Sequence, residues 1–244
     1  MAEARVAGNR ATGVMKVAAL AFMLCDHMGK MLFPGVPELR LLGRIAFPLY
    51  AWCLVVGVCY TRSVPKYMLR LALVGLISQP LYMRALNHTW AQPNIFLTLL
   101  LALGALWGLR EKRWLSQVWA PALALVLAVV LQCDYGWKGV LLVLLLYAAR
   151  QSRPALAAVM VAFCLYWGTG SGTVGTLLGR PLSMQGLTVL PALLQPWLRT
   201  QAFAILALPL MLWRCPLRWK LPPWLGYLLY PAHLVLLIVL EAVM

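Results

Sequence analysis

Long apolar runs recur from one end of this sequence to the other, and they constrain the fold more than any other feature. Each run has about 20 residues, the length of helix that crosses the hydrocarbon core of a bilayer. Of the 244 residues, 63% are hydrophobic and 11% are charged, less than half of the charged share of a typical soluble domain. The runs leave no room for a soluble domain. We therefore expect a single all-α polytopic membrane domain over residues 1–244.

The apolar runs and their flanking residues predict a bundle of about nine transmembrane helices. We expect them at 14–33, 41–61, 67–84, 93–110, 115–133, 137–150, 154–168, 201–214 and 224–243. The stretch 170–199 is ambiguous, because glycines and prolines interrupt its apolar part. It could form a tenth crossing, a re-entrant hairpin or an interfacial helix. Irregular backbone at membrane depth persists only where it is buried in protein or lines a cavity.

The net charge of +15 is distributed in basic clusters between the apolar runs rather than in one patch. This distribution is the orientation signal of an inner-membrane protein, whose cytoplasmic loops are rich in Lys and Arg. It predicts a bacterial cytoplasmic-membrane protein that contacts anionic lipids and binds no nucleic acid. With a cytoplasmic N-terminus, Arg214, Arg218 and Lys220 also lie inside only if 170–199 makes no net crossing. Nine spans therefore fit better than ten.

Common catalytic motifs are absent, so the chemistry has to come from a few polar residues. We find no GxSxG, Walker or dinucleotide-binding pattern. The six cysteines lie mostly inside apolar runs and have no metal-ligand spacing with a histidine, so we expect free thiols and no metal site.

Asp26 and His27 lie inside the first apolar run, at the expected depth of the membrane. An ionisable group there is costly and is interpreted as functional by default. A histidine beside a carboxylate suits general-base catalysis, because the carboxylate can fix the imidazole tautomer. Adjacent helix residues point about 100° apart, so Asp26 could instead orient His27 through a third group such as Arg44. A purely structural polar cluster is the alternative.

Lys16 and His27 are separated by almost three helical turns, so they share one face about 16 Å apart along the axis. Other polar residues near the apolar runs are Arg44, Asn94, Tyr135 and His233. Structural alternatives exist for three of them. Arg44 could extend to the lipid headgroups, Asn94 could cap a helix or bond across helices, and His233 could be a satisfied core histidine.

Several short segments resemble the TraX family, in the same order along nearly the whole chain. They are Asp26-His27, Gly43-Arg44 with Ala46-Phe47-Pro48-Leu49, Asn94-Ile95-Phe96, Tyr135-Gly136 with Gly139, and Tyr230 with His233-Leu234. That family includes the F-plasmid protein that N-acetylates the pilin subunit. Lys16 and His27 also resemble the basic–x10–His pattern of the wider transmembrane acyltransferases, where arginine usually takes the first position. Lysine there offers phosphate one ammonium rather than a bidentate fork.

The resemblance implies a membrane-embedded acetyltransferase that uses cytosolic acetyl-CoA. The favoured acceptor is the N-terminal amine of a conjugative pilin, and another small amine or hydroxyl that is accessible from the membrane is the alternative. His27 would be the general base, with Asp26 as the second catalytic residue. Donor-binding residues would be Lys16, Arg44, Arg62 and Lys66, and acceptor-binding residues would be Asn94, Tyr135 and His233.

The residues alone also allow a second function, a proton-coupled small-molecule transporter. Asp26, His27 and His233 would then relay protons through the membrane. The sequence has no detectable internal repeat, which disfavours a transporter built from inverted halves. The enzyme is the preferred interpretation.

Overall fold

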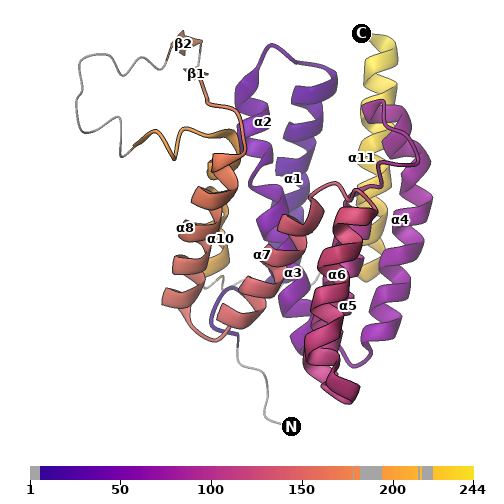
Figure 1. Cartoon of the computed structure of the whole chain (residues 1–244). Coiled ribbons are helices and arrows are strands. Elements are labelled where there is room, and N and C mark those ends of the chain that lie inside the picture. Colours follow the sequence, from indigo (N-terminus) through magenta and orange to yellow (C-terminus); the bar gives the residue numbers. More distant parts are fainter. Residues whose placement is uncertain (1–5, 178, 182–193, 214, 216–221) are drawn as a thin grey trace.

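The protein is a bundle of helices in a computed structural model that describes residues 6–177, 179–181, 194–213, 215 and 222–244. Successive helices run back and forth between the two ends of the bundle (Figure 1). They are α1 (Thr12–Met31), α2 (Pro37–Gly43), α3 (Ala46–Tyr60), α4 (Val64–Leu86), α5 (Ile95–Glu111), α6 (Ser116–Val130), α7 (Gly136–Ala149), α8 (Arg153–Thr169), α10 (Leu208–Leu212) and α11 (Pro223–Val243), with 3-10 turns η1 (Arg113–Leu115) and η2 (Thr200–Ala207). The predicted all-α class is confirmed, apart from a short ribbon of β1 (Thr176–Leu177) and β2 (Arg180–Pro181).

Each predicted helix has a counterpart, but the one predicted at 41–61 is broken in two. α2 ends at Gly43 and α3 begins at Ala46. Pro48 explains the break, because a proline cannot donate to the carbonyl four residues earlier and its ring crowds that carbonyl. The carbonyl concerned belongs to Arg44, at the junction itself.

The helix predicted at 201–214 is mostly a 3-10 helix. Pro209 has no N–H for the carbonyl of Ile205, and the N–H of Leu208 bonds that carbonyl instead. The resulting bond spans three residues, which is the 3-10 spacing. The regular turn of α10 then covers only Leu208–Leu212, and position 214 lies outside the described residues.

The two ends of the stretch 170–199 meet at the same end of the bundle. The N–H of Val174 donates to the Leu198 carbonyl (2.8 Å), and that of Thr200 donates to the Gly172 carbonyl (3.0 Å). The stretch therefore makes no net passage along the bundle, as the nine-span arrangement requires. Positions 182–193 lie outside the described residues, and so do Arg214, Arg218 and Lys220.

Several helices have the apolar composition of membrane spans. Among the described residues, Pro37–Tyr60, Arg113–Val130 and Leu225–Val243 are both long and apolar enough to cross a bilayer. Shorter apolar helices are Gly136–Ala149, Arg153–Thr169 and Thr200–Leu212. The chain is therefore a helical membrane protein.

α3 forms the centre of the bundle. The side chains of Leu49, Trp52 and Val55 are fully buried, and nearly every residue from Ala46 to Val58 is buried as well. The surrounding helices instead have one buried face. On α6 that face consists of small residues spaced by one turn, Ser116, Ala120, Ala124 and Ala128, while Val118, Val126 and Val129 face outward.

The small face of α6 packs closely against Gly108 of α5. A Cβ atom at Gly108 would lie 2.4 Å from the Ala120 Cβ and 2.6 Å from the Ser116 carbonyl oxygen. Small residues allow two membrane helices to approach this closely. One turn earlier, a Cβ at Gly104 would meet only the mobile end of Met68 at 3.6 Å.

We predict that Gly108→Ala destabilises the bundle and that Gly104→Ala does not. Both changes improve helix propensity by about 0.5–1 kcal/mol, but overpacking at Gly108 costs about 1–3 kcal/mol. The thermal unfolding midpoint of the detergent-solubilised protein should fall for Gly108→Ala and stay level or rise for Gly104→Ala. Equal midpoints for the two variants would contradict this packing of α5 on α6.

Candidate functional site

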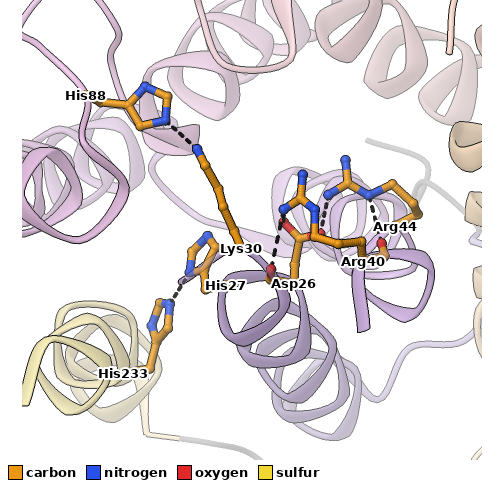
Figure 2. A network of polar contacts seen from close by, with 7 residues as sticks. All are labelled: Asp26, His27, Lys30, Arg40, Arg44, His88 and His233. Atoms are coloured by element: carbon orange, nitrogen blue, oxygen red, sulfur yellow. Dashed lines mark hydrogen bonds and ion pairs between the residues drawn. The ribbon is translucent and has the colours of Figure 1, made fainter. Parts of the chain in front are cut away.

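A cavity of about 200 Å³ opens near the end of α1, on the side of the bundle away from the start of that helix. Helices far apart in sequence contribute to its lining, from Met23 on α1 to Tyr230 on α11. The charged and titratable residues that line it are Asp26, His27, Lys30, Arg40, Arg44, His88 and Asp134, together with Tyr82, Tyr135 and Tyr230. Most of the charged ones appear in Figure 2. An apolar bundle thus concentrates several of its few charges in one cavity.

Two arginines of the α2 segment bind the carboxylate of Asp26. Arg40 donates to Oδ2 from Nη1 (2.8 Å), and Arg44 donates to Oδ1 from Nη2. The Nε of Arg44 also donates to the Arg40 carbonyl at 3.1 Å. The side chains of Asp26 and Arg44 are mostly buried, at 14% and 12% exposed. Asp26 therefore fastens α1 to α2 through two charge-assisted hydrogen bonds.

The approach of α2 to Asp26 depends on a glycine. A Cβ at Gly43 would lie 2.3 Å from the Cβ of Asp26, closer than any side chain allows. Gly43 therefore lets the backbone of α2 lie directly against Asp26.

His27 makes a different contact from that of its neighbour. Its Nδ1 lies 2.9 Å from Nε2 of His233 on α11, and the rings are stacked with centroids 5.1 Å apart and planes 14° apart. Both histidines are buried. The Nδ1 of His233 lies 3.4 Å from the Leu229 carbonyl oxygen. Neither Asp26 nor Arg44, the partners considered from the sequence, bonds His27 among the described contacts.

Lys30 and His88 close the cavity on another side. The Nζ of Lys30 donates to Nε2 of His88 at 2.8 Å, and the His88 ring stacks on Tyr82. His88 follows Asn87, which ends α4 in the left-handed conformation that asparagine tolerates well. Desolvation, and then the positive charge of Lys30, lower the pKa of His88. The ring is therefore neutral at pH 7 and can accept from the ammonium.

Asp134 lines the same cavity from the turn between α6 and α7. Gly136 completes this turn with a positive φ of 54°, a conformation that favours glycine. Asp134 is exposed where the cavity opens, and Tyr82 hydrogen bonds to its carboxylate. Desolvation by the surrounding protein nevertheless raises the pKa of Asp134 to about 6, against the lowering effect of Arg44.

The residues expected to bind the acceptor are not all in the cavity. Tyr135 lines it and stacks on Phe47, with ring centroids 3.9 Å apart. His233 lies behind His27 rather than in the lining. Asn94 caps α5, because its Oδ1 accepts from the Phe96 N–H (3.0 Å) and its Nδ2 donates to the Gly75 carbonyl (2.8 Å). The side chain of Asn94 thus has the structural role that was the alternative to acceptor binding.

The residues expected to bind the donor divide into two groups. Lys16 lies near the start of α1 and is partly buried, while Arg62 and Lys66 are exposed around the α3–α4 turn. The start of α1 and the α3–α4 turn lie at the same end of the bundle (Figure 1). Arg44 lies instead beside Asp26 in the cavity. The structure therefore separates Arg44 from the other expected donor-binding residues.

Sequence reasoning missed Lys30, Arg40, His88 and Asp134 as site residues. Lys30, His88 and Asp134 lie in or next to short connections and Arg40 lies in the short helix α2, and charged residues are common in such places at any membrane surface. One signal in the sequence could have singled out Asp134, namely the scarcity of acidic residues, because only six of the 244 residues are Asp or Glu. Two of these six line one cavity.

The fold and the site define a helical membrane protein with a buried histidine pair beside a charged cavity. The chain matches the family model described as TraX protein over residues 11–241 and belongs to the TraX family. The resemblance predicted from the sequence is thereby confirmed.

The chain is also similar to a curated protein, the probable fimbrial assembly protein FimC, serogroup H1, of Dichelobacter nodosus. The two are 29% identical over 167 residues, which are 62% of this chain and 68% of the relative. No solved structure matches the chain significantly.

We predict that Asp26→Asn lowers the free energy of unfolding by about 3–5 kcal/mol, because it leaves the buried guanidinium of Arg44 without its counter-ion, and the partly exposed guanidinium of Arg40 as well. Unfolding in mixed micelles by SDS titration measures the change. Glu111→Gln is the control, since Glu111 is exposed at the end of α5, and it should stay within about 0.5 kcal/mol of the wild type. An Asp26→Asn protein as stable as the wild type would contradict the fastening role of Asp26.

Proposed function

We propose that this TraX-family chain is a membrane-embedded acetyltransferase that moves an acetyl group from acetyl-CoA to an acceptor amine, with His27 as the general base. The observation that carries the proposal is the setting of His27. The ring lines a charged cavity, and one of its nitrogens is bonded to a second buried histidine. A general base needs such an imidazole, fixed in orientation and open to the substrate on its other side.

The contacts of the two histidines define which nitrogen of His27 is basic. The Leu229 carbonyl can only accept, so Nδ1 of His233 carries a proton and Nε2 of His233 is an acceptor. Nδ1 of His27 must then donate to that acceptor. A neutral His27 therefore has its lone pair on Nε2. The second nitrogen of a histidine is set in this way by the bond of the first.

The proposed reaction joins the acceptor nitrogen to the acetyl carbon. The new C–N bond forms, the C–S bond breaks, and CoA leaves as its thiolate. Nε2 of His27 takes a proton from the attacking nitrogen and passes it to the departing sulfur. No covalent intermediate with the protein is needed.

The size of the cavity bears on how the donor binds. At about 200 Å³ it is smaller than the ~300–1,000 Å³ sites of drug-sized ligands, so it can take the acetyl thioester but not all of CoA. We place the phosphates at Lys16, Arg62 and Lys66, and Lys16 lies about 16 Å from His27 by the rise of α1. The cavity reaches down α1 to Met23, and Ala19 one turn further is fully buried. Passage of the pantetheine arm therefore requires side chains there to move apart.

We take the N-terminus as cytoplasmic and the bundle as nine crossings of a bacterial inner membrane. Basic residues gather at the end where α1 begins, among them Arg10, Arg62, Lys66, Lys112 and Arg113, as the positive-inside rule requires. This end then faces cytosolic acetyl-CoA and anionic lipids. The cavity opens toward the opposite side, where a pilus subunit would present its amine.

A pilin subunit is the partner we propose for this reaction. The Dichelobacter nodosus relative is named as a probable fimbrial assembly protein, which links a similar chain to fimbriae. An N-terminal amine at the membrane surface is the acceptor that suits the proposed chemistry.

The transporter alternative fits the site less well. Its relay needs an oxygen of Asp26 that can hand a proton on to His27, but both carboxylate oxygens of Asp26 are bonded to guanidinium groups, of Arg40 and of Arg44. His27 and His233 alone form a short relay that ends at a backbone carbonyl. The enzyme explains the cavity and the histidine pair together.

We predict that His27→Ala lowers the rate of acetyl transfer by about 10²–10⁴-fold, the usual loss for one general base. Transfer from acetyl-CoA to an amine peptide, followed by mass spectrometry, measures the effect in purified protein. A folded His27→Ala protein with full activity would remove the catalytic role of His27.

We predict that His233→Phe slows transfer by about 10-fold or more, since His27 then loses the acceptor that holds its tautomer. His233→Gln should keep more activity, because its amide oxygen can still accept from Nδ1 of His27. The same assay as above distinguishes the two variants. Equal rates for Phe and Gln at position 233 would show that the hydrogen bond has no part in catalysis.

We predict that Lys16→Glu raises the KM for acetyl-CoA more than the KM for the amine, because a carboxylate there repels the donor phosphates. Calorimetric titration with CoA should show the same loss of affinity. Arg113→Glu is the matched control, since Arg113 is an exposed basic residue at the same end. Unchanged CoA affinity in Lys16→Glu would place the nucleotide elsewhere.

A further inference from the structure

Among the described residues, the carboxylate of Asp134 lines the cavity without an ion pair to any of the cavity's cations. Arg40 and Arg44 are both bonded to Asp26, and the ammonium of Lys30 is bonded to His88. Among the described residues, no Lys or Arg nitrogen forms an ion pair with Asp134. The polar partner of Asp134 is the hydroxyl of Tyr82. Asp134 is therefore the anionic group that a cationic ligand can reach.

The positions of the cavity residues give the site an outer and an inner part. Asp134 and Lys30 are exposed where the cavity opens, whereas His27 is buried at 7% exposed. A ligand that comes from outside meets Asp134 before it meets His27. Further inside, the lining is cationic, with Arg40 and Arg44 against the single carboxylate of Asp26.

We propose that Asp134 binds the acceptor as its ammonium where the cavity opens, and takes the first of the two protons that the acceptor nitrogen must lose. This inference rests on the acetyl transfer proposed above. It adds a second proton acceptor and makes the acceptor a primary amine rather than an alcohol.

The proton balance of amide formation requires two such steps. An ammonium has three N–H bonds and no lone pair, and the amide product keeps one N–H. Asp134 takes one proton and frees the lone pair, and the neutral amine then attacks the thioester carbon. The second proton goes through His27 to the CoA thiolate. Asp134 finally releases its proton to water, so the reaction yields the amide, CoA and one proton.

The surroundings of Asp134 favour this transfer. A terminal amine has a pKa of about 8 and an ordinary aspartate of about 4. The pKa of Asp134 is raised to about 6, which halves the difference between its pKa and that of the amine. The cations further inside disfavour a charged nitrogen, as neighbouring cations do for lysine nucleophiles. The nitrogen therefore loses its charge as it moves toward His27.

Peptide acceptors that differ in one group test this role. One short synthetic peptide has a free N-terminal amine, and its match has a hydroxyl in place of the amine. For Asp134→Asn we expect the KM of the amine peptide to rise about 10- to 100-fold, the range for loss of a charge-assisted bond. The KM for acetyl-CoA should change less than twofold. The KM for the hydroxyl peptide should not rise as the KM for the amine peptide does.

Two further variants separate this role from a structural one. Asp134→Glu keeps the charge and should recover much of the affinity for the amine peptide. Glu111→Gln removes an acid outside the cavity and should change neither KM. In the wild type, kcat/KM for the amine peptide should fall as the pH drops through about 6, because Asp134 is then protonated. This fall near pH 6 should be absent in Asp134→Asn.

The transfer assay and calorimetric titration with the amine peptide together distinguish a failure of this inference from a failure of the proposed function. If the wild type acetylates the amine peptide and Asp134→Asn has an unchanged KM for it, the role of Asp134 is overturned and the acetyltransferase stands. If the wild type transfers no acetyl group but binds the amine peptide through Asp134, the ammonium site stands without the enzyme. A wild type that neither binds nor acetylates the peptide overturns both.

Discussion

The double ion pair of Asp26 with Arg40 and Arg44 is the interaction on which the rest of the site depends. It places a charge of α1 against α2 at a depth where an unpaired charge is costly. Adjacent residues on a helix point about 100° apart. Once Asp26 is bound to α2, His27 must therefore face another neighbour, and that neighbour is α11. The carboxylate of Asp26 thus makes no hydrogen bond to His27. By binding α2 it fixes how α1 is rotated about its axis, and this rotation directs His27 toward α11.

The consequence is a site that joins the first and last helices of the chain. His27 and His233 are 206 positions apart, yet they share one buried hydrogen bond. Around this pair, the α4–α5 and α6–α7 connections bring His88 and Asp134 to the same cavity. Any polar site at membrane depth needs such convergence, because polar groups there are stable only toward a bundle interior. The apolar outer faces of α6 and α11 are consistent with this arrangement.

Much of the fold followed from the sequence, and less of the site did. Apolar runs located every predicted helix, and Pro48 and Pro209 explain the two that depart from regular α-helix. Asp26, His27, Arg44 and Tyr135 stood out as polar residues at the apolar runs and do line the cavity. Asp134, Lys30 and His88 lie in or beside connections, where a charge is ordinary. Pairings such as Asp26 with Arg40 depend on how helices rotate against one another, which no local pattern specifies.

The central claim is that an acetyl group passes through this bundle from one face of the membrane to the other. Sealed proteoliposomes test it directly, with an amine peptide trapped inside and acetyl-CoA supplied only outside. We expect the trapped peptide to become N-acetylated by those protein molecules whose N-terminal face points outward. Vesicles that retain both peptide and protein but yield no acetylated peptide would contradict transfer across the membrane.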